Sequence, residues 1–172
     1  RGRIGIFNRS YYEESLVVRV HPPILAGQHL PKELVTKSIW EERLEDISAF
    51  ERYFARQGYL ILKFFLHVSK EEQKARFLAR LDEPEKNWKF ALGDVREREH
   101  WDAYMKSYEA AIRATAAPHA PWFVVPADHK WFTRLVVSQT LVAAIEGLDL
   151  AWPKPALAPA DLAAARKALA KD

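Results

Sequence analysis

Apolar residues along the chain change their spacing several times, and each spacing predicts a different element. Short apolar runs at 3–7, 59–68 and 122–126 are typical of strands buried in a parallel sheet. Apolar residues at helical spacing predict helices from Ser38 to Gly58, from Ser69 to about Leu81, after Asp94 and after Asp128. Three strands separated by helices indicate an α/β domain with a parallel sheet.

Polar residues mark where several of these helices begin. Three pairs have the spacing of a capping box: Ser38 with Glu41, Ser69 with Glu72, and Asp94 with Glu97. A shorter helix is expected from near Ser10 until just before His21, because two prolines follow. Residues 22–37 then predict an irregular connection with a short helical piece.

Two predicted helices lie between the second and third strands, and the turn that joins them carries Lys86 and Lys89. Such a hairpin could close over a ligand as a lid, excluding water and adding cationic side chains. The alternative is a helical pair with a salt-bridged surface, since acidic residues lie near these cations in the sequence.

The composition is that of one globular domain with a short tail. The 172 residues are 49% hydrophobic and 28% charged, enough for a real core. Residues 151–160 read as a linker and residues 161–170 as an alanine-rich helix. The absence of cysteine excludes disulfides and thiolate chemistry and is compatible with a cytoplasmic location. No apolar run has the length of a membrane span.

The net charge of +3 and the pI near 9.1 suit an anionic substrate as well as they suit nucleic acid. The six histidines show no metal-ligand spacing. The only methionine is Met105, and the chain begins inside what reads as a strand. We therefore expect that the N-terminal part of the domain is missing.

A polar cluster follows the first predicted strand, with Asn8, Arg9 and Glu13 as its members. Ligands of open α/β sheets bind outside the carboxyl ends of the strands. Arg9 offers a planar fork of donors suited to phosphate, and Glu13 or Asn8 could hold a metal ion. The alternative is an ordinary strand end before a solvated helix. Lys63, inside the second strand, is either a buried, paired lysine or a phosphate contact.

Several stretches of the chain together resemble the polyphosphate kinase 2 family. They are Gly5–Glu13 (GIFNRSYYE), Lys63–Gln73, Arg76–Arg80, Asn87–Phe90, Trp101–Tyr104, Ala120–Trp122 and Ala127–Lys130. The resemblance covers residues 1–150 and implies a P-loop-kinase-like parallel sheet flanked by helices. A helical lid would span residues 69 to about 116, and residues 151–172 would form a linker and tail.

The resemblance implies phosphoryl transfer between inorganic polyphosphate and a nucleoside mono- or diphosphate, AMP or ADP, with Mg²⁺. It implies no binding of nucleic acid or membrane, and it suggests a homo-oligomer, either a tetramer or a dimer. The matched motifs assign catalytic roles to Arg9, Arg80 and Lys89, substrate binding to Asn8, Tyr12, Arg76 and Lys86, and a metal role to Glu13. Many family members carry an aspartate where this chain has Asn8.

The chain departs from the family in one respect, because none of its six glycines belongs to a glycine-rich loop ending in Gly-Lys. We expect that residues 1–172 are the C-terminal part of a family member and do not turn over alone. An ATP-dependent nucleoside monophosphate kinase of the thymidylate-kinase type is one alternative. A non-catalytic anion- or RNA-binding module is another, although the aromatic residues follow helical core stripes instead of alternating with Lys and Arg.

Overall fold

The computed structural model describes residues 2–154 and 156–170. The chain separates into two compact units, residues 1–134 and residues 135–172. Helix α7 (Lys130–Glu146) begins in the first unit and ends in the second, and α8 (Pro159–Leu169) lies in the second unit. Across the described residues, the helices are too short or too polar to cross a membrane.

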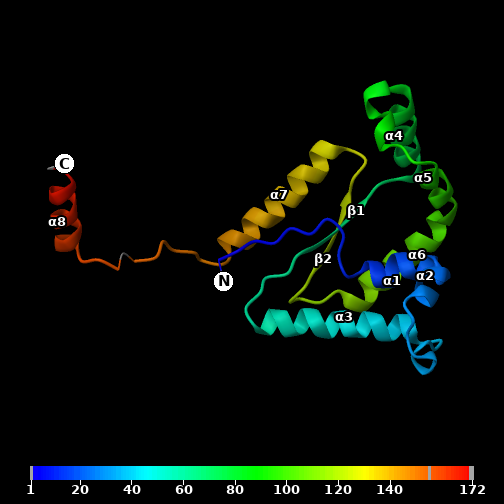
Figure 1. Ribbon diagram of the computed structural model, residues 1–172, viewed down its shortest axis with the longest axis horizontal. Coiled ribbons are helices and arrows are strands. Elements are labelled where there is room, and N and C mark those ends of the chain that lie inside the picture. The colour runs from blue at the N-terminus through cyan, green and yellow to red at the C-terminus, as the bar shows by residue number, and fades with distance from the viewer. Residues whose placement is uncertain (1, 155, 171–172) are drawn as a thin grey trace. The chain divides into compact units, whose positions relative to one another are not determined.

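Strands β1 (Lys63–His67) and β2 (Trp122–Pro126) form a parallel pair, and they are the two strands of the described residues. Lys63 pairs with Trp122 at one end, and His67 pairs with Pro126 at the other. Parallel strands require a long crossover connection. Here residues 68–121 form the crossover, and most of them are helical (Figure 1). The predicted α/β class is confirmed, with a sheet smaller than expected.

The core of the first unit forms where three helices meet. Helices α1 (Glu13–Val20), α3 (Ile39–Arg56) and α6 (Trp101–Thr115) pack against one another. The buried apolar side chains come from all three helices and from the turn before α1: Tyr12, Leu16, Leu44, Ile47 and Ala111. Between α1 and α3 lie α2 (Pro22–Gly27) and a 3₁₀ turn, η1 (Lys32–Leu34), which agree with the short helical piece predicted there.

The segment between the strands is more divided than a two-helix hairpin. Helix α4 (Lys70–Asp82) is followed by a 3₁₀ helix η2 (Pro84–Lys89), by α5 (Leu92–Glu97), by a 3₁₀ turn η3 (Arg98–His100) and by α6. We call residues 69–116 the helical insertion. It begins just after β1, and a loop over residues 117–121 connects its end to β2 (Figure 1).

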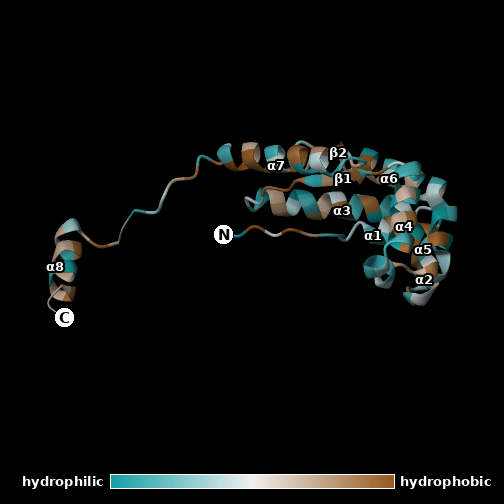
Figure 2. Cartoon of the chain, turned by 90° about the horizontal axis from the view of Figure 1, so that it is seen from above, coloured by the Kyte–Doolittle hydropathy of each residue, from teal (hydrophilic) through white to brown (hydrophobic). Residues whose placement is uncertain are grey.

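The predicted strand over residues 3–7 is wrong, because residues 2–7 form no regular element. The side chains of Ile6 and Phe7 are 87% and 83% exposed, and apolar residues follow one another along this segment (Figure 2). A strand is stabilised by hydrogen bonds to a neighbouring strand, and residues 2–7 have none in the described chain. Apolar composition alone therefore did not make this segment a strand.

Other boundaries also differ from the prediction. The strand predicted over 59–68 is limited to β1, where β2 supplies the hydrogen-bonding partner. Ser69 accepts a hydrogen bond from the Glu72 backbone N–H at 3.1 Å, which confirms that cap. The Ser38 hydroxyl instead donates to Glu42, and Asp94 lies inside α5, so those two capping boxes were wrong. In the second unit, the predicted linker has no described helix or strand before α8.

Candidate active site

Arg9 has a left-handed backbone conformation, with φ of 78°. A non-glycine residue held in this region costs roughly 1–3 kcal/mol, and such strain concentrates at functional sites. The Arg9 side chain is 79% exposed, and its Nε lies 3.3 Å from Glu13 Oε1. Because this ion pair is exposed, the guanidinium keeps donors that a phosphate can accept.

The charges of Arg9 and Glu13 act on helix α6 of the helical insertion. Burial raises the pKa of the Tyr108 hydroxyl, the Glu13 carboxylate raises it further, and the Arg9 guanidinium opposes the rise. Burial likewise raises the pKa of Tyr104, with Arg9 again opposing. Coulomb interactions weaken with distance and are screened in solution. The charge of Arg9 is therefore coupled to both tyrosines of α6, and the charge of Glu13 is coupled to Tyr108.

A cavity of about 280 Å³ opens between α4, α5 and α6. Tyr104 and Tyr108, the two tyrosines whose pKa the charge of Arg9 affects, form part of its wall. Charged, amide and aromatic groups all contribute to the lining, which consists of Gln73, Phe77, Asp94, Glu97, Arg98, Trp101, Tyr104, Met105 and Tyr108. Such a mixture can hold a ligand that has both charged and planar parts.

Arg80 does not line this cavity but contacts two residues that do. Its NH1 atom is 4.0 Å from Asp94 Oδ2, and its guanidinium lies 5.3 Å from the centre of the Phe77 ring. Asp94 and Phe77 both line the cavity. Neither Arg9 nor Arg80 lines the cavity, but Arg80 contacts two of the lining residues, and the charge of Arg9 acts on two others.

Arg76 has a structural role in this conformation. Its guanidinium donates to Glu72 and to the backbone carbonyls of Ala127 and Asp128, at 2.8–2.9 Å. Asp128 also accepts a hydrogen bond from the Ser69 backbone N–H at 2.7 Å. These bonds fasten the start of α4 to the end of β2. To contact substrate as predicted, the Arg76 guanidinium would have to give up some of these hydrogen bonds.

The two predicted lysines lie on η2 and do not line the cavity. The Lys86 ammonium pairs with the Glu83 carboxylate. The Lys89 ammonium lies 4.9 Å from the centre of the Trp88 ring, and Trp88 is 78% exposed. Both lysines are exposed, so they present cationic charge to solvent at the turn that follows α4.

Tyr12 is not at the surface, so its prediction as a substrate ligand is corrected. Its side chain is 4% exposed and belongs to the core. Its hydroxyl lies 2.9 Å from Glu51 Oε1 and accepts a hydrogen bond from Lys63 Nζ at 3.0 Å. The same cluster resolves the alternatives for Lys63, which is a buried, paired lysine and does not contact phosphate from the surface.

Asn8 and Glu13 supply the oxygen atoms that Mg²⁺ prefers in proteins. Asn8 is exposed, and the Glu13 side chain is 37% exposed. Mg²⁺ is usually held by one or two carboxylates together with substrate phosphates, so one accessible carboxylate is sufficient. The described residues contain no group of three or more acidic, histidine or cysteine side chains placed to hold a metal. The residues present therefore fit a metal that arrives with phosphate.

A polar cluster joins the start of α2 to the wall of the cavity. His21 Nε2 lies 2.6 Å from Glu97 Oε1 and 3.3 Å from the Tyr104 hydroxyl. The Tyr104 hydroxyl also donates to Glu97, and the His100 ring packs edge-on against His21 at 5.0 Å. The hydrogen bond from Tyr104 is the main cause that lowers the pKa of Glu97, with smaller contributions from His21.

This cluster makes stability depend on pH in a defined direction. A folded-state pKa of Glu97 below its usual 4.5 favours folding at higher pH, and this contribution disappears as the pH falls through the folded-state value. As the pH falls from about 5 to about 3, we expect the thermal stability of Glu97→Gln to decrease less than that of the wild type. Thermal unfolding followed by circular dichroism measures this difference. Glu99→Gln, at an exposed carboxylate on η3, should behave like the wild type.

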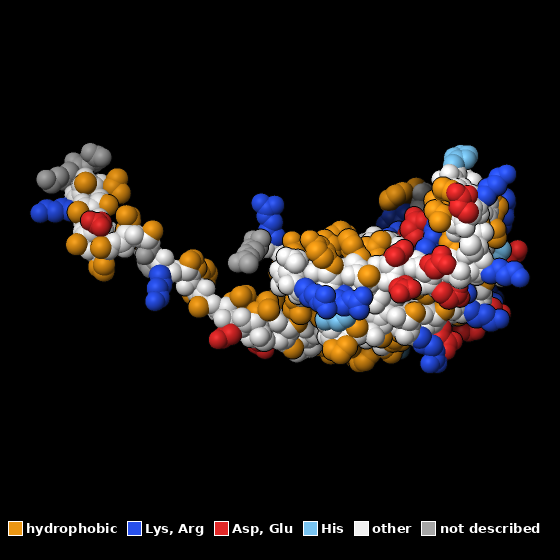
Figure 3. Space-filling view, turned by 90° about the horizontal axis from the view of Figure 1, so that it is seen from below, with side chains coloured by type: hydrophobic (Ala, Val, Ile, Leu, Met, Phe, Trp, Pro, Cys, Tyr) orange, Lys and Arg blue, Asp and Glu red, His pale blue; other side chains and the backbone are white. Residues whose placement is uncertain are grey.

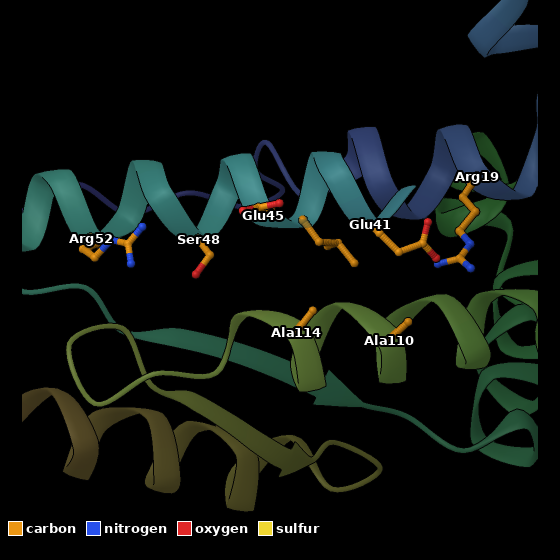
Figure 4. Close-up of a pocket in the computed structure, with 8 residues that line it drawn as sticks. Arg19, Glu41, Glu45, Ser48, Arg52, Ala110 and Ala114 are labelled. Carbon is orange, nitrogen blue, oxygen red and sulfur yellow. The ribbon is translucent and has the colours of Figure 1, made fainter. Parts of the chain in front are cut away.

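A second cavity, of about 390 Å³, lies between α3 and α6. Glu41, Glu45, Ser48 and Arg52 project from α3 toward the small side chains of α6, and Arg19 points toward Glu41 (Figure 4). None of the predicted site residues lines either cavity. The cavity within the helical insertion is the candidate site because Arg80 contacts Asp94 and Phe77 of its lining.

Sequence reasoning missed Glu51, which is 1% exposed and accepts hydrogen bonds from Tyr11, Tyr12 and Lys63. A signal for it was present, because Glu51 follows Leu44 and Ile47 at helical spacing on the buried side of α3. A carboxylate on an apolar stripe predicts a buried cation as partner. The strand that follows α3 offers that cation, Lys63.

Comparisons with known proteins agree with these motifs. The family model described as polyphosphate kinase 2 (PPK2) matches residues 1–151. The chain is 51% identical over 155 residues to an ADP-polyphosphate phosphotransferase of Rhodopseudomonas palustris, covering 90% of this chain and 54% of the relative. It is 48% identical over 155 residues to an AMP/ADP-polyphosphate phosphotransferase of Meiothermus ruber, with the same coverage.

A solved structure gives the same result for the fold. The crystal structure of polyphosphate kinase 2 from Arthrobacter aurescens TC1 matches with a TM-score of 0.86 and 40% identity, covering 99% of this chain and 56% of that chain. The chain thus spans about half the length of the relatives that it matches. By its motifs, its family match and its fold, the chain belongs to the polyphosphate kinase 2 family.

Proposed function

We propose that this chain serves in phosphoryl transfer between inorganic polyphosphate and AMP or ADP. The observations that carry the proposal are the strained backbone of Arg9, which presents an exposed guanidinium beside Glu13, and the contacts of Arg80 with two residues of the cavity lining. The names of two relatives include ADP-polyphosphate and AMP/ADP-polyphosphate phosphotransferase activity, which supports this choice of substrates.

Phosphoryl transfer depends on positioning and on neutralising charge more than on covalent chemistry by the protein. In our proposal, the planar fork of Arg9 donates to oxygens of the transferring phosphoryl group. Arg80 approaches the same group from α4, and the exposed Lys86 and Lys89 hold the polyphosphate chain. Closure of the helical insertion as a lid would exclude water, which strengthens each of these interactions.

Mg²⁺ would be held by Glu13 and Asn8, the two oxygen donors next to Arg9. When bound, it would neutralise phosphate charge and orient the phosphate oxygens. The Arg9–Glu13 ion pair has a consequence here, since Glu13 can exchange its partner for the metal while Arg9 turns to phosphate. A cytoplasmic location and a homo-oligomeric state are further parts of the proposal.

An RNA-binding module would need a continuous basic surface with accessible aromatic groups. On the face shown in Figure 3, acidic side chains lie next to basic ones. Ion pairs such as Arg113–Glu109 and Arg43–Glu14 further reduce the basic character of the surface. The structure thus favours recognition of a small anionic substrate over binding of nucleic acid.

The test compares phosphoryl donors in the active enzyme. We expect ADP and Mg²⁺ to yield ATP with polyphosphate as donor, and Lys89→Ala to raise the KM for polyphosphate by about tenfold because it removes one phosphate contact. Lys32→Ala, which removes an exposed lysine on η1, should leave the KM for polyphosphate unchanged. Coupled formation of ATP measures both.

Two results would overturn the proposal. Transfer that uses ATP but not polyphosphate would identify a nucleoside monophosphate kinase of the thymidylate-kinase type. Absence of transfer, with tight binding of RNA, would identify a binding module. An unchanged KM for polyphosphate in Lys89→Ala would show that Lys89 of η2 does not bind polyphosphate. It would not contradict the proposed reaction.

A further inference from the structure

A buried charged cluster lies where α3, the end of α6, the start of β1 and the residue before α1 meet. Glu51 and Lys63 are 1% and 8% exposed, and Lys63 Nζ lies 2.5 Å from Glu51 Oε2. The other two N–H groups of the ammonium have partners at 3.0 Å, the Tyr12 hydroxyl and the Thr115 carbonyl. An ammonium has three donors, so all of its hydrogen bonds are satisfied within the core.

The cluster connects four separate parts of the first unit. Glu51 lies on α3, Lys63 begins β1, Thr115 ends α6, and Tyr12 directly precedes α1. The Tyr12 hydroxyl lies 2.8 Å from Thr115 Oγ1. The indole of Trp122, the first residue of β2, donates to the same oxygen at 2.9 Å. The turn over residues 8–12, which we call the Arg9 turn, is therefore fixed through one hydroxyl to the end of the helical insertion.

Stability alone does not explain this arrangement. Replacing a buried ion pair by apolar residues of similar volume is often neutral or stabilising, because burial costs both charges their hydration. The cluster supplies directional bonds that an apolar core would not. The Tyr11 hydroxyl donates to Glu51 Oε1 at 2.9 Å, so two consecutive tyrosines are bound to the same carboxylate.

These bonds explain how the Arg9 turn keeps its strain. Arg9 lies three residues before Tyr12, and its left-handed conformation persists only if the surrounding structure holds it. On the N-terminal side, residues 2–7 form no regular element that could do so. On the C-terminal side, Tyr12 is fixed by Glu51, Lys63 and Thr115.

We propose that the Glu51–Lys63 pair has a positioning role. Through the Tyr12 hydroxyl, it holds Arg9 and Glu13 in place relative to the C-terminal end of α6. The inference rests on the proposed phosphotransfer, because it assigns the cluster a task within that reaction. Tyr12, Glu51 and Lys63 are positioning residues, since none of them is exposed enough to touch the substrate.

The test replaces Tyr12 by phenylalanine, which keeps the ring in the core and removes only the hydroxyl. We expect kcat to fall by about tenfold or more, because a small displacement of a transition-state group is costly. The KM for the nucleotide should change by less than about threefold, whereas a lost substrate contact would raise it. The matched control is Tyr53→Phe on α3, where the side chain is 59% exposed; kcat should not change.

Hydrogen–deuterium exchange supplies a readout that is independent of activity. In Tyr12→Phe, amides of residues 9–13 should exchange about tenfold faster, whereas the centre of α3 should exchange as in the wild type. Uniformly faster exchange would show a purely structural role and overturn the proposal, as would an unchanged kcat. If the wild type shows no polyphosphate-dependent transfer, the proposed function fails. In that case, exchange in residues 9–13 still tests whether the Tyr12 hydroxyl holds the Arg9 turn in place.

Discussion

Replacing Arg9 by alanine in the active enzyme should lower kcat by about 10²-fold, the effect of losing one donor to charge that develops in the transition state. The guanidinium is exposed and makes a surface ion pair with Glu13, so its loss leaves the fold intact. The KM for the nucleotide should change by less than about threefold, because binding of the ground state depends on other contacts. Steady-state kinetics with polyphosphate and ADP measures both parameters.

Arg113→Ala is the matched control for this variant. Arg113 and Arg9 are 77% and 79% exposed, and each pairs with a glutamate four residues away. Arg113→Ala should retain the kcat of the wild type, because an exposed ion pair of this kind contributes little. Equal losses in kcat and in affinity for Arg9→Ala would show that Arg9 binds substrate uniformly and has no special role in the transition state.

Replacing Lys63 by methionine should reduce the free energy of unfolding by about 3–5 kcal/mol, because it leaves the Glu51 carboxylate buried without a cation. Burial lowers the pKa of Lys63, whereas the hydrogen bond and charge of Glu51 oppose that shift. The carboxylate is 1% exposed and cannot turn to water. Urea unfolding followed by circular dichroism measures the loss.

A double variant separates the unpaired charge from lost packing. Lys63→Met with Glu51→Gln removes both charges and keeps a side-chain carbonyl that can accept from the tyrosines. We expect it to recover more than half of the stability that the single variant loses, since the uncompensated carboxylate is gone. Equal destabilisation by the single and double variants would show that the cost comes from the shape of the side chain instead of its charge.

Some local features of the fold could be predicted from the sequence, whereas the features that depend on distant partners could not. Ser69 caps α4 as predicted because the cap involves neighbours along the chain. Residues 3–7 are as apolar as a strand, yet a strand also needs hydrogen bonds from another segment, which a single run of residues does not specify. Asp94 has the spacing of a capping residue, but α5 begins before it.

The candidate site divides in the same way. Arg9 and Glu13 follow from a local motif, and the structure finds them exposed and paired. Tyr12 comes from the same motif but belongs to the core, because its partners Glu51 and Thr115 lie 39 and 103 residues away. Sequence spacing shows which chemistry a segment carries; it does not show which way each side chain turns.

The two attachments of the helical insertion determine where it can bend. At its start, Ser69 and Arg76 are bound to Asp128 and the end of β2. At its end, Thr115 is held by Tyr12, Lys63 and Trp122. Rigid-body swinging about either end would break these bonds, so if the helical insertion closes as a lid, we expect it to flex near the middle, where η2, α5 and η3 follow one another. Such flexing would move Lys89 on η2, while Arg80, one helical turn after the anchored Arg76 on α4, would stay in place.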